Sequence, residues 1–315
     1  MTASGDVFGL GHCCIDCLAL LDPYPDKGRK GEVVETLTIT GGPIPTALQA
    51  VVKFGGSAGF CGKVGDDADG QQVRAELRQG GLDISTMVVD PSARTAKAYI
   101  WIDRRTGERT VALDRSGLMW LKAGEFNLSP IRRARLFYTD AREQTSTRQG
   151  LETARDAGVA TMLDCGADRS GLREMMPLVD IAAVSHEFAD SFLLKSELIA
   201  ESPVERSRRL AEALLRAGAG LAVVTVGERG VVWLNGSAEG FVPGFTVQPV
   251  VDTTGAGDVF HAGFIHGWLR GWAIDDAVRF GNAAAALSVR KLSGARGIPE
   301  LAEVETLVGR QLGCR

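Results

Sequence analysis

The chain has 315 residues, 45% of them hydrophobic and 23% charged, with a formal net charge of −4. This composition is typical of a globular protein with one large or two modest domains, and it offers no basic surface for nucleic acid or an anionic membrane. No segment resembles a secretion signal or reaches the roughly 18 apolar residues of a membrane span. We therefore expect a cytoplasmic protein whose six cysteines are reduced thiols.

The first third of the chain predicts α/β units followed by a β-hairpin. Apolar runs, alternation and helical spacing predict a buried strand at 7–12, a half-exposed strand at 33–40, helices at 46–54 and 71–78, and a hairpin at 95–114. Both helices end at glycine pairs. The hairpin has a charged turn and no helix of its own, so it separates these units from the rest of the chain.

Strands and amphipathic helices alternate after the hairpin. The pattern predicts strands at 136–138, 160–163, 181–184 and 221–226, with helices at 148–157 and 204–216. Such alternation favours a mainly parallel sheet with helices on both faces. We predict a single α/β domain over 1–315 that carries a small β excursion, in preference to two independent domains.

Three cysteines near the N-terminus form a C-x-x-C pattern, with Cys13, Cys14 and Cys17 beside His12. Zinc binding or redox chemistry is one interpretation of the pattern. No second ligand pair follows at metal spacing, however. Burial as small hydrophobic side chains is the favoured interpretation.

The most informative segment is 250–260, in which Asp252-Thr253-Thr254-Gly255-Ala256-Gly257-Asp258 opens an apolar stretch. Small residues at 255, 256 and 257 leave backbone N–H groups bare at a predicted helix N-terminus, where an anion is favoured. Asp258 follows directly, where a carboxylate could accept a proton from an attacking hydroxyl. The alternative is an ordinary capping turn, in which Thr254 or Asp252 caps the helix and Asp258 only complements its dipole.

Two other phosphate-binding motifs are disfavoured. The 255–257 turn lacks the G-x-G-x-x-G pattern of dinucleotide binding and lies far from the first strand. A Walker A loop is also absent, because Gly62-Lys63 is followed by Val64 and the glycine spacing differs.

The run 252–258 resembles the C-terminal signature of the ribokinase-like, or PfkB, family of sugar kinases. Other stretches occur in that family's order, at 41–43, 62–67 with Gly70, 225–230 and 281–286. The resemblance implies a doubly wound α/β domain with a β-sheet lid over the substrate, built from strands at about 13–40 and 95–115. It also implies a homodimer through the lid, as in many members.

The resemblance assigns roles to individual positions. Asp258 corresponds to the catalytic base that activates a sugar hydroxyl, and the amides of Gly255, Ala256 and Gly257 to an anion hole, with Mg²⁺ neutralising the phosphates of ATP. The positions implied to face the sugar are Asp16, Gly41, Gly42 and Thr46. Those implied for the nucleotide are Ser185, Thr225, Gly227, Gly230 and Asn282. Asp252 and Thr254, with the 288–297 loop, resemble the monovalent-cation (K⁺) site of some members.

The chain departs from the family pattern at two places. Thr46, after an unusual Pro45, stands where the family usually has an asparagine that contacts the sugar. Ser185 stands for the asparagine of an Asn-x-x-Glu motif that organises Mg²⁺-bound water, and Glu187 is out of step with that motif. These departures leave the substrate and the handling of the metal open.

Two basic residues bear on the substrate. Together with Thr46, Lys30 and Arg142 resemble the branch that phosphorylates sulfofructose, although Leu113 replaces a polar sulfonate contact of that branch. The alternative is that both are solvated surface charges. A neutral ketose, a keto-deoxy acid and other acidic sugars stay open.

We thus predict an ATP-dependent kinase that acts on a hydroxyl of a small sugar. A nucleoside kinase is an alternative within the family, and the altered Mg²⁺ motif allows a catalytically silent sugar- or nucleotide-binding regulator. His261, one turn after Asp258, is expected to pack inside the helix layer.

Overall fold

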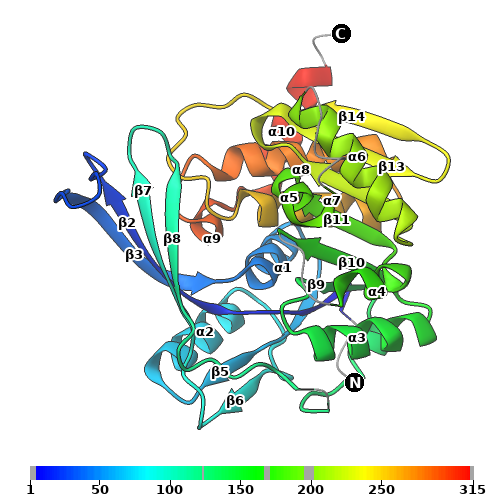
Figure 1. Cartoon of the computed structure of the whole chain (residues 1–315), viewed down its shortest axis with the longest axis horizontal. Helices are drawn as coiled ribbons and strands as arrows, with labels where there is room; N and C mark the ends of the chain where they lie inside the picture. The colour runs from blue at the N-terminus through cyan, green and yellow to red at the C-terminus, as the bar shows by residue number, and fades with distance from the viewer. Residues whose placement is uncertain (1–4, 123, 167–170, 195–201, 313–315) are drawn as a thin grey trace.

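A parallel sheet runs through the centre of the protein. The computed structural model describes residues 5–122, 124–166, 171–194 and 202–312, and in this part of the chain eight strands form the sheet in the order β14-β13-β12-β11-β10-β9-β1-β4 (Figure 1). Its strands are β1 (Val7–Leu10), β4 (Ala58–Cys61), β9 (Leu136–Thr139), β10 (Ala160–Cys165), β11 (Ile181–Ser185), β12 (Leu221–Thr225), β13 (Gly230–Asn235) and β14 (Glu239–Pro243). At one edge, β13 pairs antiparallel with both β12 and β14, and the other neighbouring strands of the sheet pair parallel.

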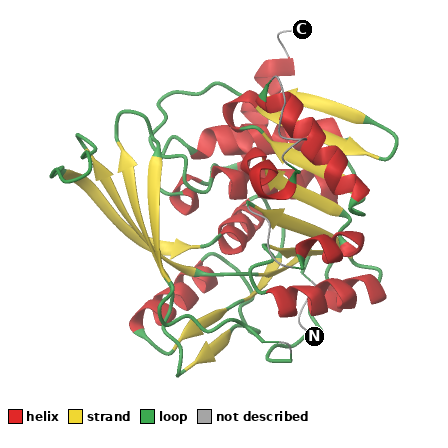
Figure 2. Ribbon diagram, viewed as in Figure 1, coloured by secondary structure: helices red, strands yellow, loops and turns green. Residues whose placement is uncertain are grey.

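Helices cover both faces of this sheet because its strands are apolar on both sides (Figure 2). Successive residues go to opposite faces: Val7 packs in one buried cluster and Phe8 in the other. The first cluster includes side chains of α1 (Pro43–Lys53), α2 (Ala68–Gln79), α7 (Ala256–Leu269), α8 (Ile274–Ser288) and α10 (Leu301–Leu312). The second includes side chains of α3 (Gln144–Asp156), α4 (Leu172–Met175), α5 (Ala189–Phe192) and α6 (Pro203–Arg216).

A separate four-stranded sheet, the lid, projects from the body on the left of Figure 1. Its order is β3-β2-β7-β8, with β2 (Cys14–Leu21), β3 (Val33–Gly41), β7 (Lys97–Asp103) and β8 (Arg109–Asp114). Ile100 and Ile102 are buried on one face, whereas Tyr99 and Trp101 on the other are 42% and 41% exposed. The lid thus covers one apolar face and leaves large side chains of the other in contact with solvent.

Short elements complete the chain. β5 (Lys63–Gly65) and β6 (Val88–Asp90) form a small parallel pair. The remaining helical turns are α9 (Gly294–Gly297), η1 (Ile131–Arg133), η2 (Met176–Leu178), η3 (His186–Phe188) and η4 (Gly227–Arg229). Among the described helices, none has the length and apolarity that crossing a bilayer requires.

The predicted strands and helices are all present, and the predicted α/β class with a doubly wound, mainly parallel sheet is confirmed. Cys13 and Cys14 are buried, as expected of small hydrophobic side chains, and Cys17 is half-buried. The antiparallel edge formed by β13 and β14 is not among the predicted elements. Its signals are present, however, because an apolar run leads into Asn235-Gly236, a hairpin turn signal.

Candidate active site

The predicted site residues gather where the parallel strands end. Ligands of open α/β sheets bind at the carboxyl ends of the strands, and several candidates stand at or just beyond these ends. They are Asp16, which follows β1 and lies in β2, Arg142 after β9, Ser185 at the end of β11 and Thr225 at the end of β12. The lid stands beside this edge, so the site has one wall from each sheet (Figure 1).

The 252–258 turn leads into α7. Gly255 has a φ of 76°, and a Cβ atom there would lie 2.8 Å from Cα of Gly294. A side chain is therefore excluded by both conformation and space. The amide of Ala256 donates to the carbonyl of Thr253 at 3.3 Å, whereas the amides of Gly255 and Gly257 have no backbone acceptor within the described chain. These two N–H groups are the ones left for an anion.

Asp258 lies in the first turn of α7, directly after this turn. Burial raises the pKa of its carboxyl well above the usual range, and the charge of Asp164 raises it further. The positive charges of Arg109 and Arg142 act in the opposite direction. A carboxylate with a raised pKa next to free amides is the arrangement that a general base for phosphoryl transfer requires.

A hydrogen-bonded network lies behind Asp258. Asp164 Oδ2 is 3.0 Å from the hydroxyl of Tyr138 and 3.1 Å from Nδ1 of His261, and these two groups are 3.1 Å apart. His261 is buried in the helix layer, as expected. The network fixes Asp164, whose charge acts on Asp258.

The sugar side of the site depends on close approach of the backbone. A Cβ atom at Gly41 would lie 2.1 Å from Cγ of Asp16, so only glycine lets the Asp16 carboxyl pack there. Burial raises the pKa of Asp16 to about 6, although Cys14 Sγ donates to it at 3.3 Å. Gly42, with a φ of 111°, precedes α1, and the buried Thr46 donates its amide to the Gly42 carbonyl at 3.1 Å.

Arg142 is positioned by a buried carboxylate. Asp140 accepts hydrogen bonds from the amides of His12, at 3.1 Å, and Arg142, at 3.0 Å, and so joins the ends of β1 and β9. Ala141, between Asp140 and Arg142 in the chain, has a φ of 52°. Such a φ is rare for a residue with a side chain, and backbone strain of this kind clusters at functional sites. Nε of Arg142 lies 3.7 Å from Oδ2 of Asp140 and is buried, with no hydrogen-bond partner among the residues described.

Lys30 is not brought together with Arg142 within one chain. It is exposed in the loop between β2 and β3, at the far end of the lid. Five residues of β2 separate Asp16 from the start of that loop. At ~3.3 Å per residue of strand, Asp16 and the start of the loop are about 17 Å apart. Leu113 lies in the edge strand β8 and is exposed.

The nucleotide candidates lie around the end of β12. Gly227 has a φ of 58°, and Gly230, with a φ of 122°, approaches β14 so closely that a Cβ atom would lie 2.1 Å from the Val242 carbonyl oxygen. Thr225 Oγ1 is 3.5 Å from the carbonyl of Val184. Asn282 in α8 donates Nδ2 to the carbonyl of Val242 at 3.3 Å, which ties α8 to the end of β14.

Comparison with known proteins agrees with this geometry. The pfkB family carbohydrate kinase profile matches residues 5–301. The chain belongs to this family. It is 30% identical to Fructokinase-1 of Zea mays over 293 residues, which cover 85% of this chain and 87% of that one. It is 27% identical to 5-dehydro-2-deoxygluconokinase of Shouchella clausii, with 97% of this chain and 96% of that one covered. As a pfkB carbohydrate kinase, it is an ATP-dependent sugar kinase.

Solved structures show the same ribokinase-like fold. A putative ribokinase from Agrobacterium tumefaciens superimposes with a TM-score of 0.87 at 28% identity and 99% coverage of both chains. A fructokinase with bound ATP from Xylella fastidiosa gives a TM-score of 0.79 at 25% identity, with 98% and 99% covered. The predicted fold and family are thus confirmed.

The cation candidates of this kinase differ in how well they fit a metal. Asp252 is buried and accepts hydrogen bonds from the amides of Thr254 and Ser293, each at 2.8 Å. Oγ1 of Thr254 is buried and has no hydrogen-bond partner in the part of the chain that the structure describes. An orphaned hydroxyl oxygen beside a buried carboxylate fits K⁺. Glu187 in η3 is exposed. Desolvation opposes its ionisation, but hydrogen bonding from Ser185 and the charge of Arg109 hold its pKa below the usual range. An ionised carboxylate suits Mg²⁺ or its bound water.

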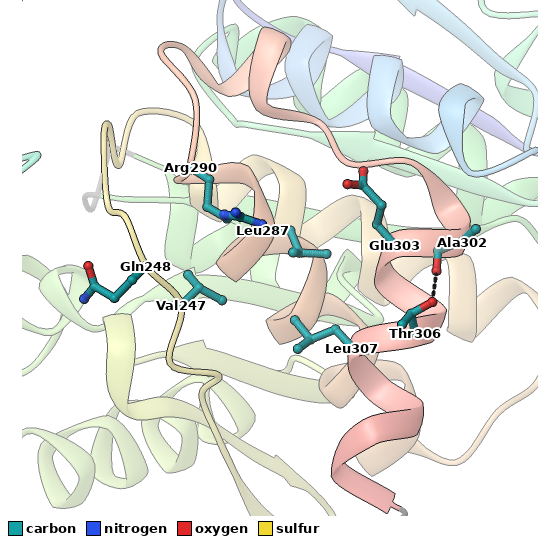
Figure 3. Close-up of a pocket in the computed structure, with 8 residues that line it drawn as sticks. All are labelled: Val247, Gln248, Leu287, Arg290, Ala302, Glu303, Thr306 and Leu307. Carbon is teal, nitrogen blue, oxygen red and sulfur yellow. Dashed lines mark hydrogen bonds between the residues drawn. The ribbon is translucent and has the colours of Figure 1, made fainter.

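A cavity of about 520 Å³ lies on another part of the kinase (Figure 3). It is lined by Val247, Gln248, Leu287, Arg290, Ala302, Glu303, Thr306 and Leu307, which come from the loop before the 252–258 turn, from α8, from the loop after α8 and from α10. Of the predicted site it includes Arg290, in the 288–297 loop.

Four residues close to the site are absent from the predicted set: Arg109, Tyr138, Asp140 and Asp164. Asp140 and Asp164 had a usable signal, since each is a carboxylate at the end of a predicted apolar strand, where α/β ligands gather. Arg109 had none, because the lid hairpin brings it to the turn from 144 residues away.

Proposed function

We propose that this kinase transfers the γ-phosphoryl group of ATP to a hydroxyl of a small sugar, with Asp258 as the general base and the amides of Gly255 and Gly257 as the anion hole. The amide of Ala256, which the sequence also predicts for the anion hole, bonds to the Thr253 carbonyl instead. One observation carries the proposal: a carboxyl with a raised pKa follows directly on backbone amides left free at the start of α7. The base and the anion hole are thereby held in one rigid turn.

The chemistry follows from these positions. The sugar hydroxyl gives its proton to Asp258 as its oxygen bonds to the γ-phosphorus, and the bond from that phosphorus to the bridging oxygen breaks, releasing ADP. The free amides would stabilise the charge on the phosphoryl oxygens. Mg²⁺, held through Glu187 and Ser185, would neutralise the phosphates, and K⁺ at Asp252 and Thr254 would support the turn.

On the sugar side, Asp16 would accept hydroxyl hydrogen bonds, with Gly41 leaving room for its carboxyl and Gly42 for the carbonyl of His12. Thr46 connects the two halves of the site, because its Cγ2 lies 3.5 Å from where a Cβ of Gly255 would be. On the nucleotide side, Thr225, Gly227, Gly230 and Asn282 would shape the ATP pocket.

A coupled ADP-release assay over ketoses, aldoses, keto-deoxy acids, a sulfonated ketose and adenosine tests the proposal. ADP release should appear with a sugar and fall about 10²–10⁴-fold in Asp258→Asn, the range of general-base catalysis. The matched control is Asp276→Asn, an exposed aspartate in the first turn of α8, which should keep full turnover. Undiminished turnover in Asp258→Asn would show that Asp258 is not the base.

A second candidate, a sugar that carries an anionic group, is supported by Arg142. Among the described residues its buried Nε has no hydrogen-bond partner, although Asp140 lies 3.7 Å away, and a guanidinium binds carboxylate or sulfonate oxygens well. Arg142→Ala should then raise the KM for an anionic sugar far more than for a neutral ketose, and equal effects would refute the idea. Lys30→Ala should have the smaller effect, because Lys30 lies at the far end of the lid.

We also propose that the kinase is a cytoplasmic homodimer joined through the lid. The lid exposes several large apolar side chains, namely Val33, Val34, Tyr99, Trp101, Val111 and Leu113. Apolar surface of this kind is usual at subunit interfaces.

A further inference from the structure

After β8 the chain returns from the lid to the body through a strap, residues 115–122, that touches both. Leu118 packs against the buried apolar cluster of the lid, and Leu121 is buried in the second cluster of the body, with side chains of α3 and α6. The Leu121 amide donates to Oε2 of Glu143 at 2.7 Å, and its carbonyl accepts from Oγ of Ser146 at 2.9 Å. The strap is thereby held to the lid at one point and to α3 at another.

Trp120 stands between these two points and is left largely open. It is 43% exposed, whereas the adjacent Leu121 is 2% exposed. The indole lies 6.0 Å from the imidazole of His12, centroid to centroid, with the two rings tilted by 50°. His12 is buried, so the indole rests on a fixed side chain and keeps much of its own surface free of protein.

His12 places the indole on the side of the site that is assigned to the sugar. His12 lies two residues beyond β1, at the edge where ligands of open α/β sheets bind. Its carbonyl oxygen is 2.4 Å from where a Cβ of Gly42 would be, and its amide donates to Asp140 at 3.1 Å. Because Asp140 also holds the amide of Arg142, Trp120 stands beside groups that are proposed to surround the sugar.

The other side chains proposed for this side of the site are polar. Asp16 offers a carboxyl, Thr46 a hydroxyl and Arg142 a guanidinium, and these groups suit the hydroxyl or anionic groups of a sugar. A sugar also has C–H groups that form an apolar surface, and small-molecule sites are lined mainly by apolar and aromatic side chains. A flat indole supplies such a surface and loses little conformational freedom, because it has only two χ angles.

We propose that Trp120 is a specificity-determining residue whose indole packs against the C–H groups of the bound sugar. The contact forms when the sugar binds and persists through phosphoryl transfer, so it stabilises the ground state and the transition state alike. Trp120 therefore acts on sugar binding and leaves the chemical step to the other groups of the site. This inference rests on the proposed function, since it takes a small sugar beside Asp16 and Arg142 as the substrate.

Steady-state kinetics with the full-length kinase and the sugar that the ADP-release panel identifies test this contact. Trp120→Ala should raise the KM for the sugar at least about 10-fold and change kcat less than about threefold, because it removes uniform binding. Trp120→Phe keeps a smaller aromatic ring and should lie between this variant and the wild type. The matched control is Trp272→Ala, a tryptophan 40% exposed at the opposite end of α7 from Asp258, which should keep the wild-type constants.

Tryptophan fluorescence gives a readout independent of turnover. Adding the sugar without nucleotide should change the emission of the wild type, and this change should be lost in Trp120→Phe and kept in Trp272→Phe. Thermal unfolding checks that each variant folds, and Trp120→Phe replaces Trp120→Ala in the kinetics should that variant not fold.

The outcomes separate this inference from the proposed function. A wild-type KM for the sugar in Trp120→Ala, a lower kcat at unchanged KM, or an unchanged fluorescence response in Trp120→Phe would overturn the inference alone. Full activity of Asp258→Asn, or no ADP release by the wild type with any sugar of the panel, counts against the proposed function.

Discussion

The central sheet and the lid differ in how far their strands are buried. Strands of the central sheet such as β1 and β9 are buried along their whole length, between helices on both faces. The lid strand β8 is exposed at five of its six residues, and β7 alternates between buried and exposed side chains. The central sheet is thus buried on both faces, whereas the lid has one buried face and one face whose large apolar side chains are exposed.

The two sheets also supply different chemistry. Helices and loops packed on the central sheet supply the 252–258 turn and Arg142, which donate backbone amides to the buried carboxylates of Asp252 and Asp140. The lid supplies Asp16, which lies in β2 beside Gly41, and Arg109, which contacts Thr253 where the hairpin seats on 250–253. We infer that, in the proposed reaction, the core holds the place of phosphoryl transfer and the lid adds groups to the site from a second sheet.

The largest effect expected in the core comes from the glycines of the turn. Gly257→Ala should lower kcat by about 10²–10³-fold, if the open space that its Cβ would enter is where the phosphoryl group lies. The fold should tolerate it, because alanine favours a helix over glycine by up to ~1 kcal/mol. Gly255→Ala should lose both activity and stability, by about 1–3 kcal/mol, because its φ is 76° and Gly294 is in the way.

Urea unfolding and ADP release measured on the two variants check this prediction. Gly236→Ala is the control, since a Cβ atom there meets nothing and the site is distant in sequence. Full turnover in Gly257→Ala would contradict the assigned position of the anion hole and weaken the distinction between the two sheets.

The lid carries Asp16, whose negative charge serves the proposed sugar binding but destabilises the folded protein. Burial raises the pKa of Asp16 to about 6, from 3.8. The folded state therefore holds this proton more tightly than the unfolded chain, so the contribution of Asp16 to stability falls as pH rises from about 4 through about 6. Asp16→Asn should stabilise the protein at pH 8 by about 1–3 kcal/mol and lose this advantage below pH 4.

The same substitution should weaken the enzyme. Asp16→Asn should raise the KM for the sugar, and the wild-type kcat/KM should fall below about pH 6 as Asp16 is protonated. Chemical denaturation at pH 4, 6 and 8, together with a pH profile of kcat/KM, measures both effects. A variant that is less stable than the wild type at pH 8 would show that Asp16 supports the fold and carries no functional strain.

Sequence patterns predicted the core better than the lid for a physical reason. Buried parallel strands are continuous apolar runs, and the 252–258 turn is contiguous, so Asp258 and the free amides could be located from the chain alone. Arg109 and Thr253 are 144 residues apart in the sequence, so their contact could not be predicted. The separation of Lys30 from Arg142 could not be predicted either, because it depends on the direction in which β2 runs. The position of Asp164 was predictable, but its network with Tyr138 and His261 depends on how α7 packs on the sheet.

The smallest effect on the folded chain is expected at the open face of the lid. If a second copy covers Tyr99 and Trp101, the double variant Tyr99→Ser/Trp101→Ser should shift the protein from dimer to monomer in light scattering. The unfolding free energy of the monomer should change by less than ~1 kcal/mol, because both side chains are about two-fifths exposed within one chain. Trp272→Ser, an equally exposed tryptophan outside the lid, is the matched control and should leave the oligomer unchanged. A wild-type protein that is monomeric at micromolar concentration would mean that the open face has no second copy to cover it, and the lid would then close over the sugar within a single chain.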